Sequence, residues 1–182
     1  VKALENPSAS DIDVIVMQYI ADQQLRLAKE SGSKDILGYV RHRIDLTNIR
    51  TAIRFINAGL TDVSASLIRG GLIPVASLGS TQENVRAAVA RSPYYAILGA
   101  DVFDLAKDAV VFERTAARIT ADDIGRMWNV PLTVEPAFAF AAIALAHIRI
   151  IRFIFIGKRN QLSPQEIKRV LPPFLPSTHY SA

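Results

Sequence analysis

Apolar residues recur every three or four positions along most of the chain, which is the spacing of one face of an α-helix. The clearest case is residues 34–57, with an apolar stripe of Leu37, Val40, Ile44, Leu46, Ile49, Ile53 and Ile56. Ser33 stands before this segment as a candidate N-cap, and Ala58-Gly59 follows it. No segment shows the alternation of a β-strand. The pattern predicts an all-α fold of about eight helices joined by short loops.

Capping and breaking residues place the other helices. We expect them at about 11–31, 62–68, 85–91, 102–119, 120–129, 136–156 and 164–171. Ser80 to Glu83 and Ser163 to Glu166 are candidate capping boxes, and Gly157 is expected to end the long helix before it. The prolines that follow residue 171 predict an extended tail.

A weak internal repeat links two of the predicted helices. A shift of about 102 residues places Ile49-Arg50 on Ile151-Arg152 and Leu60-Thr61 on Leu162-Ser163. Both copies predict a long helix, a tight turn and a short capped helix, so we expect the two to superpose. We divide the chain into residues 1–72, the later half of one helical unit, and residues 73–182, a final unit with the proline-rich tail.

The most apolar stretch, residues 136–157, could be a membrane span or a buried helix. Arg149 and Arg152 lie within it, and each would cost about 2.5–3.5 kcal/mol near the middle of a bilayer. The large apolar side chains return only about 0.3–0.6 kcal/mol each, so the sum does not favour insertion. We therefore predict a helix buried inside a soluble domain.

Composition excludes several classes of protein. The chain has 182 residues, half of them hydrophobic, and no cysteine, so disulfides, thiolate zinc sites and cysteine nucleophiles are absent. The net charge is +4, but the basic residues are scattered and the densest cluster is Lys158-Arg159. This distribution favours solvated charge over a site for nucleic acid. The chain begins at Val1 with no signal-peptide pattern, and we expect it to be part of a longer protein.

Candidate reactive groups each have a simpler structural explanation. Gly157-Lys158 lacks the other residues of a phosphate-binding loop. Asp122-Asp123 and the pair Asp101 and Asp104 are expected to cap helix starts rather than to catalyse. Of the histidines, His42 is expected on an exposed basic patch and His147 in the interior, neither as a metal ligand. We predict no catalytic, cofactor or metal site.

Two polar residues inside a good helix need an explanation. Asp45 and Asn48 lie on one stripe of residues 34–57, and both residue types are poor helix formers. They indicate either specific partners, such as arginines of a neighbouring helix, or a solvated polar face.

At this stretch the chain resembles the C subunits of V-type and A-type rotary ATPases, which correspond to the d subunits of the eukaryotic V-type enzymes. The matching positions lie in register along nearly the whole chain and are Ile44-Asp45-Leu46, Asn48-Ile49, Arg54, Gly70-Gly71-Leu72-Ile73, Glu135-Pro136, Phe140, Ile148, Arg152, Gly157-Lys158, Asn160, Glu166-Ile167 and Leu171. The chain departs from the family at His147, where the family usually has Glu, and at Phe140, where it usually has Tyr.

The resemblance implies a funnel of similar helical units and a non-catalytic role without a cofactor. It implies a peripheral protein on the cytoplasmic face of the membrane, between the central-shaft subunits of the soluble motor and the proteolipid ring, coupling the two for ion transport or ATP synthesis. No nucleic acid or small-molecule substrate is expected. The resemblance assigns structural roles to the family-motif residues Asp45, Asn48, Arg54, Gly70, Gly71 and Arg152. At least partial burial between helices is expected for the four with charged or amide side chains, Asp45, Asn48, Arg54 and Arg152. An unrelated helical adaptor and a basic nucleic-acid-binding domain are the alternatives.

Overall fold

The computed structural model describes residues 9–60 and 63–171, and every regular element in these ranges is helical. The all-α prediction is confirmed. Within the described residues, nine α-helices and one 3-10 turn follow in the order α1 (Ala9–Glu30), α2 (Lys34–Asn57), η1 (Ser64–Ser66), α3 (Val75–Leu78), α4 (Gln82–Ala90), α5 (Tyr95–Leu98), α6 (Val102–Leu105), α7 (Ala109–Trp128), α8 (Glu135–Arg159) and α9 (Pro164–Val170). The predicted proline-rich extension lies outside the described residues.

Two of the three predicted serine caps are confirmed, while the capping box expected over Ser80 to Glu83 is wrong, because Thr81 is the N-cap of α4 and accepts from the N–H of Asn84. Ser33 is the N-cap of α2, where its hydroxyl accepts a hydrogen bond from the N–H of Ile36 at 3.1 Å, and α2 covers the predicted residues 34–57. Ser163 and Glu166 form a reciprocal capping box at the start of α9. Each cap satisfies backbone donors that the first turn of a helix leaves without partners, so these helix starts are fixed locally.

The helix expected over residues 102–119 is in fact two helices. α6 ends at Leu105, and α7 begins after Asp108, whose Oδ1 accepts hydrogen bonds from the N–H groups of Val110 and Val111. α7 then continues to Trp128 without the expected new start at residue 120. Asp122 and Asp123 are therefore inside a helix, and their predicted capping role is wrong. Apolar spacing continues across the break near Asp108, so periodicity alone could not reveal it.

Asp108 supports a prediction about pH. The N–H of Val111 and the guanidinium of Arg169, at 3.0 Å, are among the partners that hold the pKa of Asp108 below its usual value. A carboxyl whose pKa is lower in the folded state stabilises the protein above its usual pKa, and this contribution disappears as the pH falls through the lowered pKa. Asp108→Asn keeps a capping oxygen and removes the charge. We expect its melting temperature to lie below that of the wild type at pH 7 and to converge with it in acid.

The control for this series is Asp122→Asn, an exposed aspartate on the same helix. Melting curves across the acid range provide the measurement. A difference between Asp108→Asn and the wild type that stays constant with pH would contradict a charge-based contribution.

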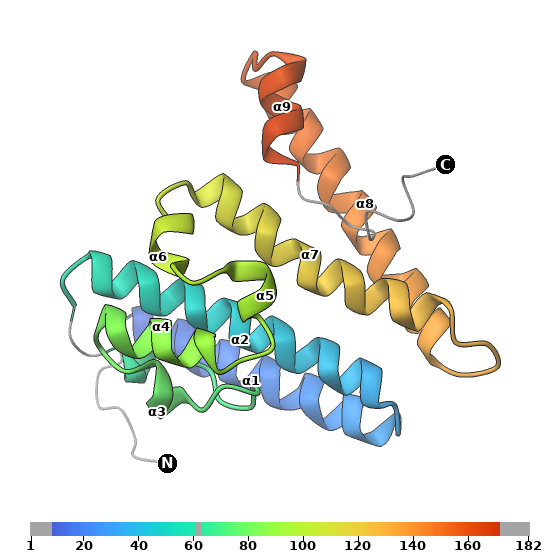
Figure 1. The fold of residues 1–182 in the computed structure, drawn as a ribbon. Coiled ribbons are helices and arrows are strands. Elements are labelled where there is room, and N and C mark those ends of the chain that lie inside the picture. The colour runs from blue at the N-terminus through green and yellow to red at the C-terminus, as the bar shows by residue number, and fades with distance from the viewer. Residues whose placement is uncertain (1–8, 61–62, 172–182) are drawn as a thin grey trace.

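Helix α2 is the central element of the fold, and two apolar clusters share it. One cluster packs Leu46, Ile49 and Ile53 of α2 against residues of the 63–119 region. The other packs Val40 and Ile44 against α1, the end of α7 and the start of α8. Figure 1 shows α2 and α7 crossing the middle of the molecule. The first cluster contains residues from both of the predicted units, 1–72 and 73–182. The division into these units and the superposition of their long helices stay predictions.

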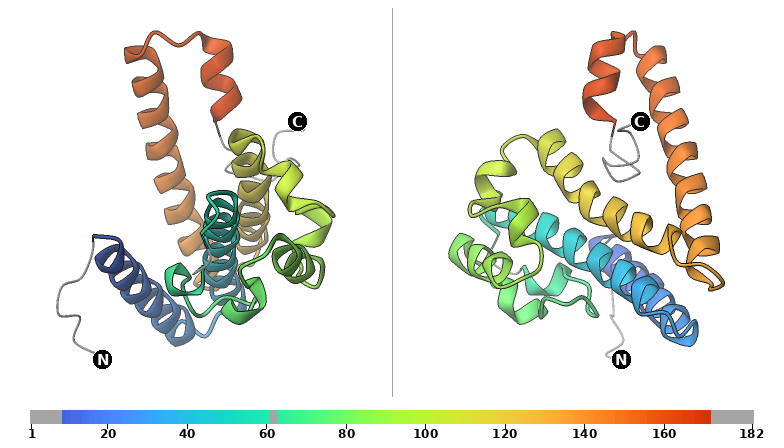
Figure 2. Two further views of the ribbon diagram at one scale, coloured as in Figure 1. Left: turned by 90° about the vertical axis from the view of Figure 1, so that its left-hand side faces the viewer. Right: turned by 45° about the vertical axis from the view of Figure 1, so that its right-hand side comes forward.

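The long apolar helix α8 is mostly exposed, so the expected burial inside the domain is wrong for this chain. Among the described helices it alone is long and apolar enough to cross a membrane. Only 6% of its most apolar 18-residue stretch is buried. α8 contacts α7 and then continues outward with α9, away from the remaining helices (Figures 1 and 2). His147 is also exposed rather than interior. The most exposed large apolar residues of α8 are Phe140, Leu145, Ile148, Ile151, Phe153, Phe155 and Ile156.

Candidate functional site

The most distinctive chemical feature of the described chain is a carboxylate buried in the core. Asp45 of α2 has no exposed surface. Its Oδ2 accepts hydrogen bonds from the N–H of Leu72 at 2.8 Å and from the hydroxyl of Tyr94 at 2.5 Å. Its Oδ1 accepts a third from the N–H of Ile73 at 3.1 Å. The buried carboxylate therefore joins α2 to the loop at residues 70–73 and to the segment before α5.

Burial and hydrogen bonding act in opposite directions on the acidity of this pair. Burial raises the pKa of Asp45, while the hydrogen bonds from Tyr94, Leu72 and Ile73 offset part of that effect by stabilising the carboxylate. Burial and the nearby carboxylate both raise the pKa of Tyr94, so its phenol keeps the proton that it donates. The arrangement is that of a structural contact between a donor and an acceptor.

One turn further along α2, Asn48 holds Ile68, which lies just before that loop. Its side-chain nitrogen donates to the carbonyl of Ile68 at 2.7 Å, and its side-chain oxygen accepts from the N–H of Ile68 at 2.8 Å. Asn48 is 1% exposed. A buried amide that satisfies both backbone groups of one residue works like a short strand pairing, and it fixes the direction in which the chain leaves this segment.

Two glycines let the loop approach α2 this closely. Gly70 has a φ of 108°, a backbone conformation that other residues rarely adopt. Gly71 is needed for space, because a Cβ atom at this position would overlap Oδ1 of Asp45. Asp45 and Asn48 thus belong to one contact with Gly70 and Gly71, which follow them in the sequence by 22 to 26 residues.

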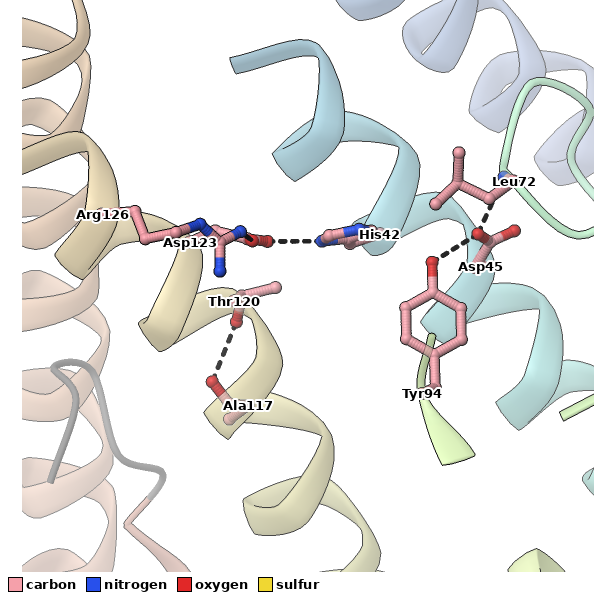
Figure 3. A network of polar contacts seen from close by, with 8 residues as sticks. All are labelled: His42, Asp45, Leu72, Tyr94, Ala117, Thr120, Asp123 and Arg126. Carbon is pink, nitrogen blue, oxygen red and sulfur yellow. Dashed lines mark hydrogen bonds and ion pairs between the residues drawn. The ribbon is translucent and has the colours of Figure 1, made fainter. Parts of the chain in front are cut away.

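A second buried carboxylate contacts α2 through His42. Asp123 of α7 is 2% exposed, and its Oδ2 lies 2.7 Å from Nδ1 of His42. Arg126 donates to Oδ1 of the same carboxylate. The His42 ring meets the Tyr94 ring edge to face, with 5.5 Å between the ring centres. Figure 3 shows how His42 lies between the two carboxylates and connects α7 to α2.

Sequence reasoning missed the contact between His42 and Asp123. The flanking Arg41 and Arg43 favour an exposed patch for His42, but its side chain is only 16% exposed and points toward α7. The available signal was its distance of three residues from Asp45, which places both on the same side of α2. Nothing in the spacing of residues indicated that Asp123 would be its partner.

Arg54 and Arg152 do not belong to this network. Both are exposed, so the expectation that they are buried between helices is wrong. Arg54 lies in the last turn of α2, where a cation is favoured by the helix dipole. Arg152 lies on the exposed part of α8. Backbone amides and a tyrosine hydroxyl, not arginines, are the donors that Asp45 uses.

The chemistry of the described residues is that of a structural network. Asp45, Asn48 and Asp123 have specific partners that occupy them. No group of three or more potential metal ligands is found among the described residues. These contacts are typical of a helical protein in which polar core residues fix the positions of neighbouring helices and loops.

The whole chain up to its last residues matches one family. The family model for the ATP synthase (C/AC39) subunit matches residues 1–170, and the chain belongs to this family. It is therefore a subunit of the V-type and A-type rotary ATPases, which are membrane-associated complexes. No curated protein and no solved structure matches the chain significantly.

Proposed function

We propose that this protein is a non-catalytic part of the central stalk, which couples the rotor shaft of the soluble motor to the membrane rotor ring. The family match over residues 1–170 carries the proposal. In this role the protein lies on the cytoplasmic face of the membrane as a peripheral subunit. Its partners are the shaft subunits and the proteolipid ring, and it binds no nucleic acid or small-molecule substrate.

The internal structure suits a part that transmits torque. A coupler must resist deformation, and close-packed interiors have low compressibility. The hydrogen bonds of Asp45 and Asn48 add fixed connections between α2 and the segment of residues 68–73. A funnel built from similar helical units is part of this proposal, with α2 and α8 as corresponding long helices.

A coupler also needs surfaces for its partners, and α8 offers one. Phe140, Ile148, Ile151 and Phe155 are each at least half exposed and fall at helical spacing along α8. Exposed apolar stripes of this kind on soluble proteins mark interaction sites. We name these four residues the outer stripe of α8.

The test is assembly of the outer-stripe variant Phe155→Glu. Phe155 is 71% exposed, so the variant should keep the melting temperature of the wild type. We expect it to lose at least about tenfold in affinity for the other stalk and ring subunits, because a charge replaces an aromatic side chain that the partner would bury. Co-purification of tagged protein with those subunits, quantified by mass spectrometry, gives the measurement.

Leu132→Glu is the control, since Leu132 is a fully exposed loop residue. It should assemble like the wild type. If neither the wild type nor the control associates with any rotary ATPase subunit, the stalk function is wrong. If all three proteins assemble equally well, the function stands and the outer stripe is not a docking surface.

A further inference from the structure

A second apolar surface lies on the other flank of α8. Here α1, α2, α7 and α8 enclose a hollow of about 550 Å³. Residues of α2 and α7 form its floor, and residues of α1 and α8 form its two walls. Figure 2 shows α1 and α8 diverging on the same side of the other two helices. We call this hollow the α1–α8 groove; it does not include the outer stripe.

The lining of the groove is unusually rich in small apolar residues. Six of its residues are alanines from the three helices α1, α7 and α8: Ala28, Ala117, Ala121, Ala141, Ala142 and Ala146. Larger apolar residues stand at the walls, and two of them, Leu27 and Leu145, are each 57% exposed. Small residues let a neighbouring helix approach to an interaxial distance of about 8 Å, the close end of the usual range. Apolar side chains of the groove are thus exposed to solvent. Its small residues leave room for a helix to pack closely against it.

The charge of the lining has one sign. Among the described residues, Arg43 of α2 and Arg149 of α8 are the only charged ones that line the groove, and no carboxylate does. Both arginines are exposed, and neither forms an ion pair with any of the described residues. The guanidinium of Arg43 lies over the ring of Tyr39 at 5.8 Å, which holds it at the edge of the apolar surface. An occupant that complements this lining needs apolar groups flanked by negative charge.

We propose that the α1–α8 groove binds one amphipathic helix of a partner protein, with large apolar side chains on one face and acidic residues beside them. Leucine-like side chains fill the space over the alanines, while carboxylates reach Arg43 and Arg149. The alanines of the lining favour a helix over an acyl chain, because close approach of two helix axes adds contacts that a single acyl chain cannot make. The inference goes beyond the proposed function by assigning a separate surface and the chemistry of its partner.

The experiment uses a labelled synthetic helix of about 18 residues, or five turns, with leucines at helical spacing and glutamates beside them. A matched peptide carries lysines in place of the glutamates. Fluorescence anisotropy measures the binding of each to the wild type and to Arg149→Glu, Arg152→Glu and Ala141→Phe. Arg152 is the matched control, because it is exposed on the same helix but does not line the groove.

We expect the glutamate peptide to bind the wild type more tightly than the lysine peptide does. Arg149→Glu should weaken the glutamate peptide at least about tenfold and strengthen the lysine peptide, whereas Arg152→Glu should change neither more than about twofold. Ala141→Phe, which places a ring in the exposed wall, should weaken both. Equal effects of Arg149→Glu and Arg152→Glu would overturn the proposal, as would absence of binding by the glutamate peptide.

A lipid occupant is tested in parallel with vesicles of phosphatidylcholine that contain phosphatidylglycerol. Vesicle binding that Ala141→Phe abolishes, together with no peptide binding, would assign the groove to an anionic lipid and overturn the helix proposal. The co-purification that tests the stalk function does not depend on this result. A wild type that assembles with rotary ATPase subunits but ignores the glutamate peptide would refute only the groove assignment.

Discussion

Asp45→Ala is expected to lower the free energy of unfolding by about 2–4 kcal/mol, because it leaves two fully buried donors, the N–H of Ile73 and the hydroxyl of Tyr94, without an acceptor. The N–H of Leu72 also loses its partner but is closer to solvent. Urea denaturation of the variant and the wild type measures the change. The slope of the transition should stay the same, since the fold itself is retained.

Tyr94→Phe is the matched comparison for Asp45→Ala. It removes one of the three hydrogen bonds and leaves Asp45 with its two backbone donors, so its cost should be about 1 kcal/mol. Co-purification with the stalk subunits separates stability from docking. If Asp45→Ala unfolds like the wild type but no longer assembles, Asp45 contacts a partner and its structural role is wrong.

The parts of the fold that the sequence predicts are those whose signals are local. Ser33 and Ser163 each satisfy backbone donors within their own first turn, so their positions mark helix starts without knowledge of the rest of the chain. Asp45 and Asn48 could be singled out because a carboxylate and an amide inside a good helix imply partners. The identity of those partners required the structure, because Tyr94 lies 49 residues away in the chain.

The wrong predictions concern positions where the signal is not local. Short polar side chains favour helix starts, which is why Asp123 resembles a capping residue, yet α7 passes through it and buries it against His42. Apolar neighbours in sequence favour burial of Arg54 and Arg152. A long, flexible arginine can bury its stem and keep its charge in water, so neighbouring apolar residues do not decide its exposure.

Helix α8 shows a different limit of sequence reasoning. A helix that is apolar on nearly all sides is expected to be buried, and the composition of α8 leads to that prediction. In this structure α8 is covered only where it packs against other helices, chiefly α7 and also α9. Its outer stripe and the side that forms a wall of the α1–α8 groove are exposed to solvent. Under the proposed stalk function, the apolar pattern of α8 belongs to surfaces that partner subunits cover. Proteins that work within a complex carry such patterns for surfaces that are covered by their partners.

Gly71→Ala is expected to destabilise the protein by about 1–3 kcal/mol, because its added methyl group would overlap Oδ1 of Asp45. The carboxylate cannot move aside without breaking its bond to the N–H of Ile73. Gly38→Ala is the control: Gly38 lies inside α2 with open space around its Cβ position, so this change should stabilise the helix by about 0.5–1 kcal/mol.

The double variant Gly71→Ala with Asp45→Ala tests whether position 71 needs glycine because of the Asp45 carboxylate. Asp45→Ala removes the atom with which the methyl group collides, so the cost of Gly71→Ala should shrink in that background. The cost of the two changes together should therefore be at least about 1 kcal/mol less than the sum of the single costs. Urea denaturation of all four proteins closes the cycle. Strict additivity would mean that Gly71 is required for its backbone conformation or for another neighbour, and not for the close approach of the loop to the buried carboxylate.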